Sequence, residues 1–314
     1  MSRRRVLSGL ALIGLVVASG TGYLGWRLAA GEAVPAGALE LGRAGTMLYV
    51  EPGSGRVRQA PAGGGEAFGA GPTCHRVYAG GDTLACLRAT AVPMASELDI
   101  TEAGSTSRRT LELWGNPSRV RVSASGRLVA WTVFRTGDTY LVPGAFATTA
   151  GIFDLRLGTH YGSLEDFTAL VDGTAYKAVD RNFWGITFAA DDRTFYATMA
   201  SKGRTWLMRG DLVTRRLVAM RQNVECPSIS PDGSRLAYKF RTGKTWRLHV
   251  LQLPSGADWA LAETAHVDDQ PVWLDDQTVA YSKNDGDRPG VFAVPADGSG
   301  VPRRIVTGSS PAAG

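Results

Sequence analysis

The residues that could do chemistry are few, and their spacing matches no familiar catalytic set. A serine hydrolase would carry a Gly-x-Ser-x-Gly elbow between a strand and a helix, and the sequence has none. Zinc sites need paired ligands such as His-Glu-x-x-His or Cys-x-x-Cys, and neither pattern is present. The four histidines are scattered and are His75, His160, His249 and His266. We therefore expect no catalytic residues, no bound metal, no cofactor and no enzymatic activity.

Carboxylates, amides and one tryptophan instead precede segments that we expect to be the innermost strands of a repeated sheet. Loops at such positions ring one mouth of a central channel. The candidate binding residues at this mouth are Asn182, Trp184, Glu225, Asp268, Asp269 and Gln270. Polar groups of these types, converging on one opening, suit a cation, a sugar or a basic peptide end. Lining of a water-filled channel is the alternative interpretation.

These positions are defined by a repeat with a period near 43 residues. The clearest copy runs from Pro227 to Tyr238, and a second from Pro271 to Tyr281 is one residue shorter in its turn. Each copy is an alternating strand, a turn rich in Gly and Asp, and a second strand, which predicts a β-hairpin. Five copies end at Cys86, Trp131, Tyr196, Tyr238 and Tyr281. Two further strand-like segments follow each hairpin, so each unit is predicted to be a four-stranded antiparallel propeller blade.

The spacing of the copies predicts an all-β propeller of six blades over residues 41–308. The interval from Trp131 to Tyr196 is 65 residues, which predicts an insertion at about 136–181. Residues 46–58 begin a sixth unit, and we expect the tail after Ile305 to add one strand to it. That strand closes the ring and removes unpaired strand edges.

The segment from Ser230 to Tyr238, Ser-Pro-Asp-Gly-Ser-Arg-Leu-Ala-Tyr, resembles the repeat of TolB-like (WD40-like) propellers, approximately W-S-P-D-G-x-x-I-A-F. The resemblance covers the body from Leu41 onward, although the other copies keep the turn and lose Pro-Asp-Gly. The resemblance implies a TolB-like propeller of the exported actinobacterial type, a group with no settled activity. It also implies that the chain acts through protein contacts, as TolB-like propellers do. The aspartates on hairpin turns, such as Asp232, are expected to stabilise the turn backbone and not to bind a metal.

Two of the three cysteines are predicted to form a disulfide. Cys74 and Cys86 lie symmetrically about residue 80 in one hairpin, so we expect them to be cross-strand neighbours on the first two strands of a blade. Two buried free thiols are the alternative. Cys226 has no partner in its own hairpin and is expected to be a free, buried thiol.

An export segment is predicted at the N-terminus, within residues 1–28. Arg3, Arg4 and Arg5 precede 21 uncharged residues, Val6 to Trp26, which suit either a cleaved signal peptide or a transmembrane helix. The arginines keep the N-terminus cytoplasmic and place the body outside, through the general secretory or the twin-arginine route. Residues 29–40 are predicted to be a linker and 309–314 a terminal tail. The expected location is the cell membrane, with a single pass and the body outside, or the exterior.

Net charge argues against nucleic acid as a partner. The formal charge is +5, but the export segment holds four arginines, and the body without them is near +1. We expect a monomeric, non-catalytic binding or scaffold propeller that contacts a protein partner in the cell envelope. The rival interpretation is a channel-mouth ligand or metal site with hydrolase or lactonase-type activity, using Glu225, Asp268 and Asp269 as metal ligands or as acid and base.

Overall fold

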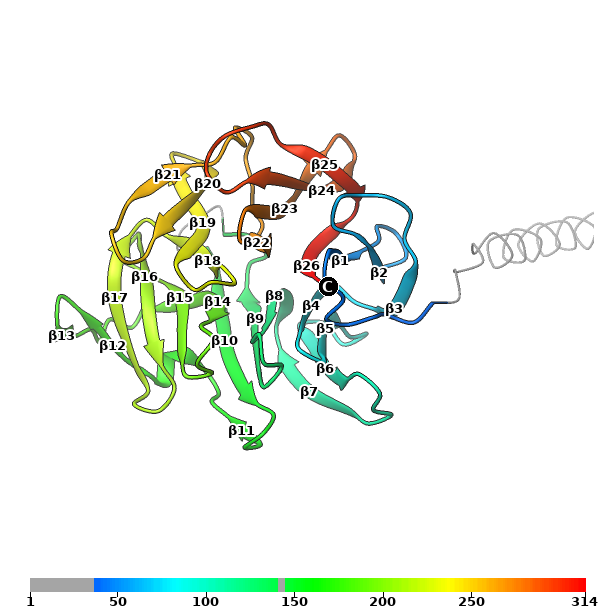
Figure 1. The fold of residues 1–314 in the computed structure, drawn as a ribbon. Coiled ribbons are helices and arrows are strands. Elements are labelled where there is room, and N and C mark those ends of the chain that lie inside the picture. Colours follow the sequence, from blue (N-terminus) through cyan, green and yellow to red (C-terminus); the bar gives the residue numbers. More distant parts are fainter. Residues whose placement is uncertain (1–36, 141–144) are drawn as a thin grey trace, which may run out of the picture. The chain divides into compact units, whose positions relative to one another are not determined.

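The computed structural model describes residues 37–140 and 145–314, which form six antiparallel sheets arranged in a ring (Figure 1). This confirms the predicted all-β propeller of six four-stranded blades. The predicted export segment, residues 1–28, and the first part of the linker lie outside the described residues. Within the described ranges, no helix has the length and apolar character needed to cross a bilayer.

Blades one to three contain, from the channel outward, four strands each. Blade one is β26 (Ser309–Ala313), β1 (Thr46–Val50), β2 (Arg56–Pro61) and β3 (Gly69–Thr73). Blade two is β4 (Arg76–Gly80), β5 (Thr83–Ala89), β6 (Ala95–Glu102) and β7 (Arg108–Trp114). Blade three is β8 (Asn116–Val122), β9 (Leu128–Thr136), β10 (Ala147–Asp154) and β11 (Thr159–His160).

Blades four to six follow the same order, and blade four carries an extension. Blade four is β14 (Asn182–Phe188), β15 (Thr194–Ser201), β16 (Arg204–Asp211) and β17 (Arg216–Gln222). Its extension is the 3-10 helix η1 (Leu164–Asp166), β12 (Thr168–Val171) and β13 (Thr174–Ala175). Blade five is β18 (Glu225–Ile229), β19 (Arg235–Thr242), β20 (Thr245–Gln252) and β21 (Asp258–Ala260). Blade six is β22 (Val272–Asp275), β23 (Thr278–Asp285), β24 (Arg288–Pro295) and β25 (Arg303–Thr307).

The aromatic residues that end the predicted repeats lie in the cores between blades. Tyr238 and Tyr281 are fully buried, and Trp131 is 2% exposed. The two tyrosine hydroxyls donate hydrogen bonds to carboxylates, that of Tyr281 to the buried Glu263 and that of Tyr238 to the half-buried Asp258. In the two repeats that end at Tyr238 and Tyr281, the apolar ring is buried and the hydroxyl is satisfied.

Hairpin turns are stabilised by their own side chains, as the sequence predicts. The Asp232 carboxylate accepts hydrogen bonds from the Ser230 hydroxyl and the Ser234 amide at 2.5 and 3.0 Å. The Asp191 carboxylate accepts from the amide of Thr194 in the same way, at 2.7 Å. These aspartates form the turns, as expected from the sequence.

The C-terminal strand closes the ring, as predicted. Strand β26 pairs with β1 in antiparallel register, with Leu48 opposite Ala312 (Figure 1). The Ser310 hydroxyl accepts a hydrogen bond from the Val77 amide at 3.1 Å, which ties β26 to the innermost strand of blade two. Residues 309–314, which were predicted to be a terminal tail, thus include an innermost strand.

The range 136–181 contains both regular and additional structure. Strands β10 and β11 complete blade three, and the additions are the loop around Tyr140 and residues 161–181. In the second of these, β12 pairs in parallel with β17, placing Thr168 opposite Arg216. Because every other described strand pair is antiparallel, this parallel contact marks the extension as an attachment to the outer edge of blade four.

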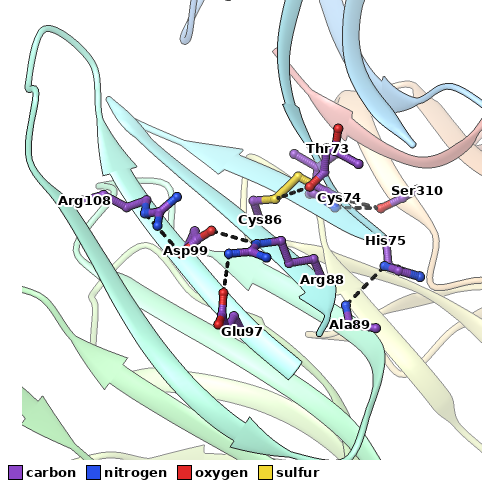
Figure 2. Close-up of a disulfide and its surroundings, with 11 residues drawn as sticks. Thr73, Cys74, His75, Cys86, Arg88, Ala89, Glu97, Asp99, Arg108 and Ser310 are labelled. Carbon is purple, nitrogen blue, oxygen red and sulfur yellow. Dashed lines mark hydrogen bonds and ion pairs between the residues drawn. A yellow bond between two sulfur atoms is a disulfide. The ribbon is translucent and has the colours of Figure 1, made fainter. Parts of the chain in front are cut away.

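The predicted disulfide between Cys74 and Cys86 is present, with the two Cα atoms 5.4 Å apart (Figure 2). The predicted register is wrong in detail. Val77 lies opposite Cys86 in the ladder, while Cys74 lies in the connection between β3 and β4. The hairpin turns about residues 81 and 82 and not about residue 80, so the disulfide joins that connection to β5. Cys226 is free and buried, as expected.

Candidate functional site

All six innermost strands run in the same direction, so the channel has two different mouths. We call the mouth where these strands begin the loop mouth, and the mouth where they enter the hairpin turns the hairpin mouth. A cleft of about 740 Å³ lies at the loop mouth. We call it the aromatic cleft, and it is bounded by blades three, four and five and by the extension of blade four.

The floor of the aromatic cleft is a group of stacked aromatic side chains. The Tyr140 and Trp184 rings stack with centroids 5.0 Å apart, and Phe146 meets Trp184 edge-on at 5.4 Å. Tyr140 and Trp184 are 2% and 1% exposed. Trp184 also has a buried indole N–H with no hydrogen-bond partner. The floor is therefore rigid, largely apolar and carries one unsatisfied donor.

Glu225 lies fully buried beside this floor. Its Oε1 accepts hydrogen bonds from Arg241 Nε at 3.0 Å and from Trp246 Nε1 at 2.9 Å. Its Oε2 has no partner. The Arg241 guanidinium packs over the Trp246 ring at 4.3 Å and donates to the Tyr140 carbonyl at 2.9 Å. Glu225 thus holds Arg241 at the inner wall of the cleft.

Two amide side chains of the cleft, the predicted Asn182 and the neighbouring Asn223, hold backbone segments together. Asn182 Oδ1 accepts from the amide and the hydroxyl of Thr148 at 2.8 and 2.5 Å. Asn223 donates to the Arg241 carbonyl and accepts from the Arg241 amide at 3.1 and 3.0 Å. Both side chains line the cleft, but most of their hydrogen-bonding capacity is used internally.

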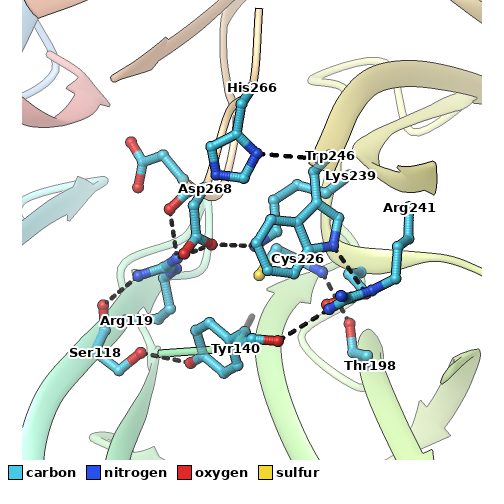
Figure 3. A network of polar contacts seen from close by, with 12 residues as sticks. Ser118, Arg119, Tyr140, Thr198, Cys226, Lys239, Arg241, Trp246, His266 and Asp268 are labelled. Carbon is cyan, nitrogen blue, oxygen red and sulfur yellow. Dashed lines mark hydrogen bonds and ion pairs between the residues drawn. The ribbon is translucent and has the colours of Figure 1, made fainter. Parts of the chain in front are cut away.

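Below the cleft, Asp268 belongs to a buried ionic network (Figure 3). Its Oδ1 lies 2.6 Å from Lys239 Nζ and 3.7 Å from Arg119 Nη2. Burial alone would lower the pKa of Lys239, but Asp268 and the other acidic groups nearby together outweigh it and hold that pKa above its ordinary value. Burial would likewise raise the pKa of Asp268, while Lys239 and Arg119 hold it below its ordinary value. Both pKa shifts favour the charged forms, so Lys239 and Asp268 form an ion pair.

Asp269 and Gln270 are committed to the structure of the ring. The Asp269 carboxylate accepts from the amide and hydroxyl of Ser282 at 3.0 and 2.8 Å. Gln270 Nε2 donates to the carbonyls of Ile186 and Pro227 at 3.2 and 2.8 Å, so it links blade six to blades four and five. Both residues are buried.

The structure therefore divides the six predicted site residues into two groups. Asn182, Trp184 and Glu225 line the aromatic cleft. Asp268, Asp269 and Gln270 do not line it, because the connection between β21 and β22 descends into the channel before β22 begins. Among the described residues, no group of three or more His, Cys, Asp or Glu side chains is placed to hold a metal ion.

Sequence reasoning missed the cations that the channel contains. Arg119 and Arg121 alternate with Val120 and Val122 on β8, and the two valines pack in the core between blades. A period-two strand that buries one valine face must turn the arginines to its other face. That alternation was a usable signal, whereas the pairing of Lys239 with Asp268 joins different blades and leaves no local pattern.

No protein-family model matches the sequence, and no curated protein matches it either. Solved structures do show the fold. TolB from Acinetobacter baumannii superposes with a TM-score of 0.63 at 15% identity, over 85% of this chain and 66% of that chain. A chain of a nidogen/laminin complex gives 0.56 at 13% identity, over 85% of this chain and 98% of that chain. A puromycin-hydrolyzing peptidase from Mycobacterium tuberculosis gives 0.54 at 13% identity, over 86% of this chain and 43% of that chain.

These neighbours share an architecture at identities too low to carry an activity across, and this chain spans about two thirds of the Acinetobacter TolB chain. The repeat Ser230 to Tyr238, the six sheets and the closing strand β26 agree with the superposition on TolB. In fold, the chain is a TolB-like six-bladed β-propeller.

Proposed function

We propose that this chain is a non-catalytic binding propeller that holds a protein partner in the cell envelope, and that the partner docks in the aromatic cleft. The observation that carries the proposal is the cleft itself, which combines about 740 Å³ of space with a floor of packed aromatic rings. Clefts of about 300–1,000 Å³ are typical of ligand sites. A peptide segment of a partner with one apolar anchor residue fits this space.

The rim of the cleft has the residue types of a protein interface. Val179 is fully exposed, and Lys202 and Arg204 are exposed beside it, with Asp180 and Glu165 on the same rim. Exposed apolar and arginine side chains around a buried aromatic floor are the usual sources of binding free energy at protein interfaces. The mixed signs of charge favour a partner segment that carries both signs.

The rim is fixed in position before any partner binds. The Asp180 carboxylate accepts from the Ser201 hydroxyl at 2.5 Å and from the Lys202 amide at 2.6 Å. These hydrogen bonds hold the pKa of Asp180 below its ordinary value. They also fasten the extension to the turn between β15 and β16. A preorganised rim lowers the entropic cost of binding.

The location outside the cytoplasm rests on two observations. The disulfide between Cys74 and Cys86 suits an oxidising compartment, and the N-terminal arginines precede an apolar segment. In this proposal the propeller is a monomer that is anchored by that segment or released after its cleavage.

The rival hypothesis uses Glu225, Asp268 and Asp269 as a channel metal site or an acid–base pair, but of these three only Glu225 lines the aromatic cleft. Glu225 is bound to Arg241 and Trp246, Asp268 to Lys239, and Asp269 to Ser282. Glycosidase-type chemistry would need two carboxylates facing one substrate. These three carboxylates instead face cations and hydroxyl groups of the protein.

The test is photocrosslinking in intact cells with the full-length tagged chain. A photoreactive amino acid replaces Arg204 on the cleft rim, and in the control it replaces the exposed Arg288 on blade six. We expect one reproducible envelope protein to be crosslinked from position 204 and not from position 288. Equal crosslinking from both positions, or no protein product from position 204, would overturn the proposal.

A further inference from the structure

Three arginines, two of them buried and one half-buried, lie in the channel, in a part that the aromatic cleft does not reach. We call Arg76, Arg119 and Arg121 the channel arginines. Arg76 Nε and Arg119 Nη1 donate to the same carbonyl oxygen, that of Ser118, at 2.7 and 2.9 Å. Arg121 lies two residues further along β8 and donates to the Pro271 carbonyl at 2.6 Å. Their hydrogen bonds are mainly to backbone carbonyls, which carry no full negative charge.

The positive charge of this layer exceeds the negative charge that faces it. Lys239 uses Asp268 as its partner, and Asp269 is the other carboxylate close enough to act on all three channel arginines. Four cations thus face Asp268 and Asp269, since the third nearby carboxylate, Glu225, is paired with Arg241. Burial, and the charge of Arg119, lower the pKa values of both Arg76 and Arg121. Buried charge without a counter-charge is strongly unfavourable, so this layer favours an added anion.

The hairpin mouth offers space for such an anion. A cavity of about 270 Å³ opens there, and its lining includes Arg121, Tyr78 and Thr187 together with the turn residue Asp232 and Gly314. The Nε atoms of Arg119 and Arg121 are buried and have no hydrogen-bond partner. Both residues are 6% exposed. The cavity therefore ends against a guanidinium that has donor capacity to spare.

Two hydroxyl groups complete the set of donors. The Arg121 guanidinium packs over the Tyr78 ring at 4.3 Å, which places Tyr78 beside the same end of the cavity. The Thr187 hydroxyl accepts from the Ile229 amide at 3.2 Å, so its proton is free to be donated elsewhere. A planar guanidinium with neighbouring hydroxyls is a common recognition pattern for phosphate and sulfate.

We propose that the hairpin-mouth cavity binds a small oxyanion of the phosphate or sulfate type, held by Arg121 with the hydroxyls of Tyr78 and Thr187. The volume excludes a folded partner and suits one such anion with a few water molecules. This site is separate from the aromatic cleft, so the anion site and the protein-docking proposal can fail independently.

Equilibrium dialysis of the full-length chain against radiolabelled inorganic phosphate, and separately sulfate, tests the proposal at fixed ionic strength. We expect saturable binding of one anion per chain. Arg121→Met should weaken it by about 100-fold or abolish it, because a charge-assisted contact is lost. The control Arg288→Gln removes an exposed arginine of blade six and should leave binding unchanged.

A second variant covers the case in which Arg121→Met does not fold. Tyr78→Phe keeps the ring under Arg121 and removes only the hydroxyl, so we expect a folded protein that binds about tenfold more weakly. Absence of saturable binding of both anions to the wild-type chain would overturn the proposal. So would binding that neither Arg121→Met nor Tyr78→Phe weakens relative to Arg288→Gln.

Discussion

At the scale of single residues, the channel depends on a lysine that has no contact with water. Lys239 is fully buried, with Nζ 2.6 Å from Asp268 Oδ1 and 4.2 Å from the centre of the Trp246 ring. Trp246 in turn donates to Glu225, which holds Arg241 at the aromatic cleft. The ionic pair below the cleft and the wall of the cleft are thus parts of one connected network.

Removing the carboxylate of this pair should cost more stability than removing the whole pair. Asp268→Asn leaves the Lys239 ammonium buried without a counter-charge, and we expect a loss of about 3 kcal/mol in the free energy of unfolding. The double variant Lys239→Met with Asp268→Asn should recover part of that loss. Urea denaturation of the single and double variants gives the coupling free energy. Strict additivity of the two substitutions would contradict the ionic pairing.

The Lys239–Asp268 pair also predicts the direction in which the free energy of unfolding changes with pH. The pKa of Asp268 in the folded chain is held below its ordinary value of 3.8. Its stabilising contribution is therefore complete above that value and is lost as the pH falls through the folded pKa. The difference in unfolding free energy between wild type and Asp268→Asn should be constant from about pH 7 to 5 and shrink below about pH 4. Urea denaturation across this range measures it, and a gap that widens in acid would be incompatible with the pairing.

At the scale of elements, local sequence patterns predicted the strands and hairpins, but they did not predict pairings between segments far apart in the chain. Alternation and turn residues predicted the hairpins, because both are set within about a dozen residues of chain. The Cys74–Cys86 register was displaced because the turn centre could be placed only approximately from Gly80 and Gly81. The parallel pairing of β12 with β17 joins segments almost fifty residues apart, and no local periodicity records it.

The disulfide should be visible in thiol counts and in stability. Under denaturing conditions we expect one reactive thiol per chain, that of Cys226, and three after reduction. Cys74→Ala with Cys86→Ala should lower the free energy of unfolding by about 3 kcal/mol, the magnitude expected for a closed loop of this length. As a control, a reductant should destabilise the wild type but not this double variant. Three reactive thiols without reduction would show that the pair is not bonded.

The closing strand should be as important to stability as any strand of the interior. Ala312 is fully buried between blades one and two, so Ala312→Asp forces a charge into that core and displaces β26 from β1. We expect a loss of at least about 3 kcal/mol and a tendency to associate through the exposed edge. Thermal denaturation and light scattering test both. Ala91→Asp, at an exposed turn, is the matched control and should be close to neutral.

At the scale of the whole molecule, blade count and ring closure followed from the sequence, while the site followed only in part. The length of the repeat and the size of the body together give six blades, so the number of blades could be predicted without knowledge of distant contacts. Asn182, Trp184 and Glu225 lie at the loop mouth, since each begins or nearly begins an innermost strand. Tyr140 was not assigned to the site because it comes from an irregular loop, and the channel cations were missed because their partners lie on other blades.

The measurement that bears most directly on the proposed function compares two exposed valines in connections of blade four. Val179 lies on the rim of the aromatic cleft, and Val213 lies in the turn between β16 and β17, with 73% of its side chain exposed. Each is replaced by Asp in the full-length tagged chain, and the partner recovered from crosslinked cells is quantified by mass spectrometry. Docking in the cleft predicts that Val179→Asp reduces recovery at least about tenfold while Val213→Asp recovers as much as wild type. Equal recovery from both variants would contradict docking in the aromatic cleft.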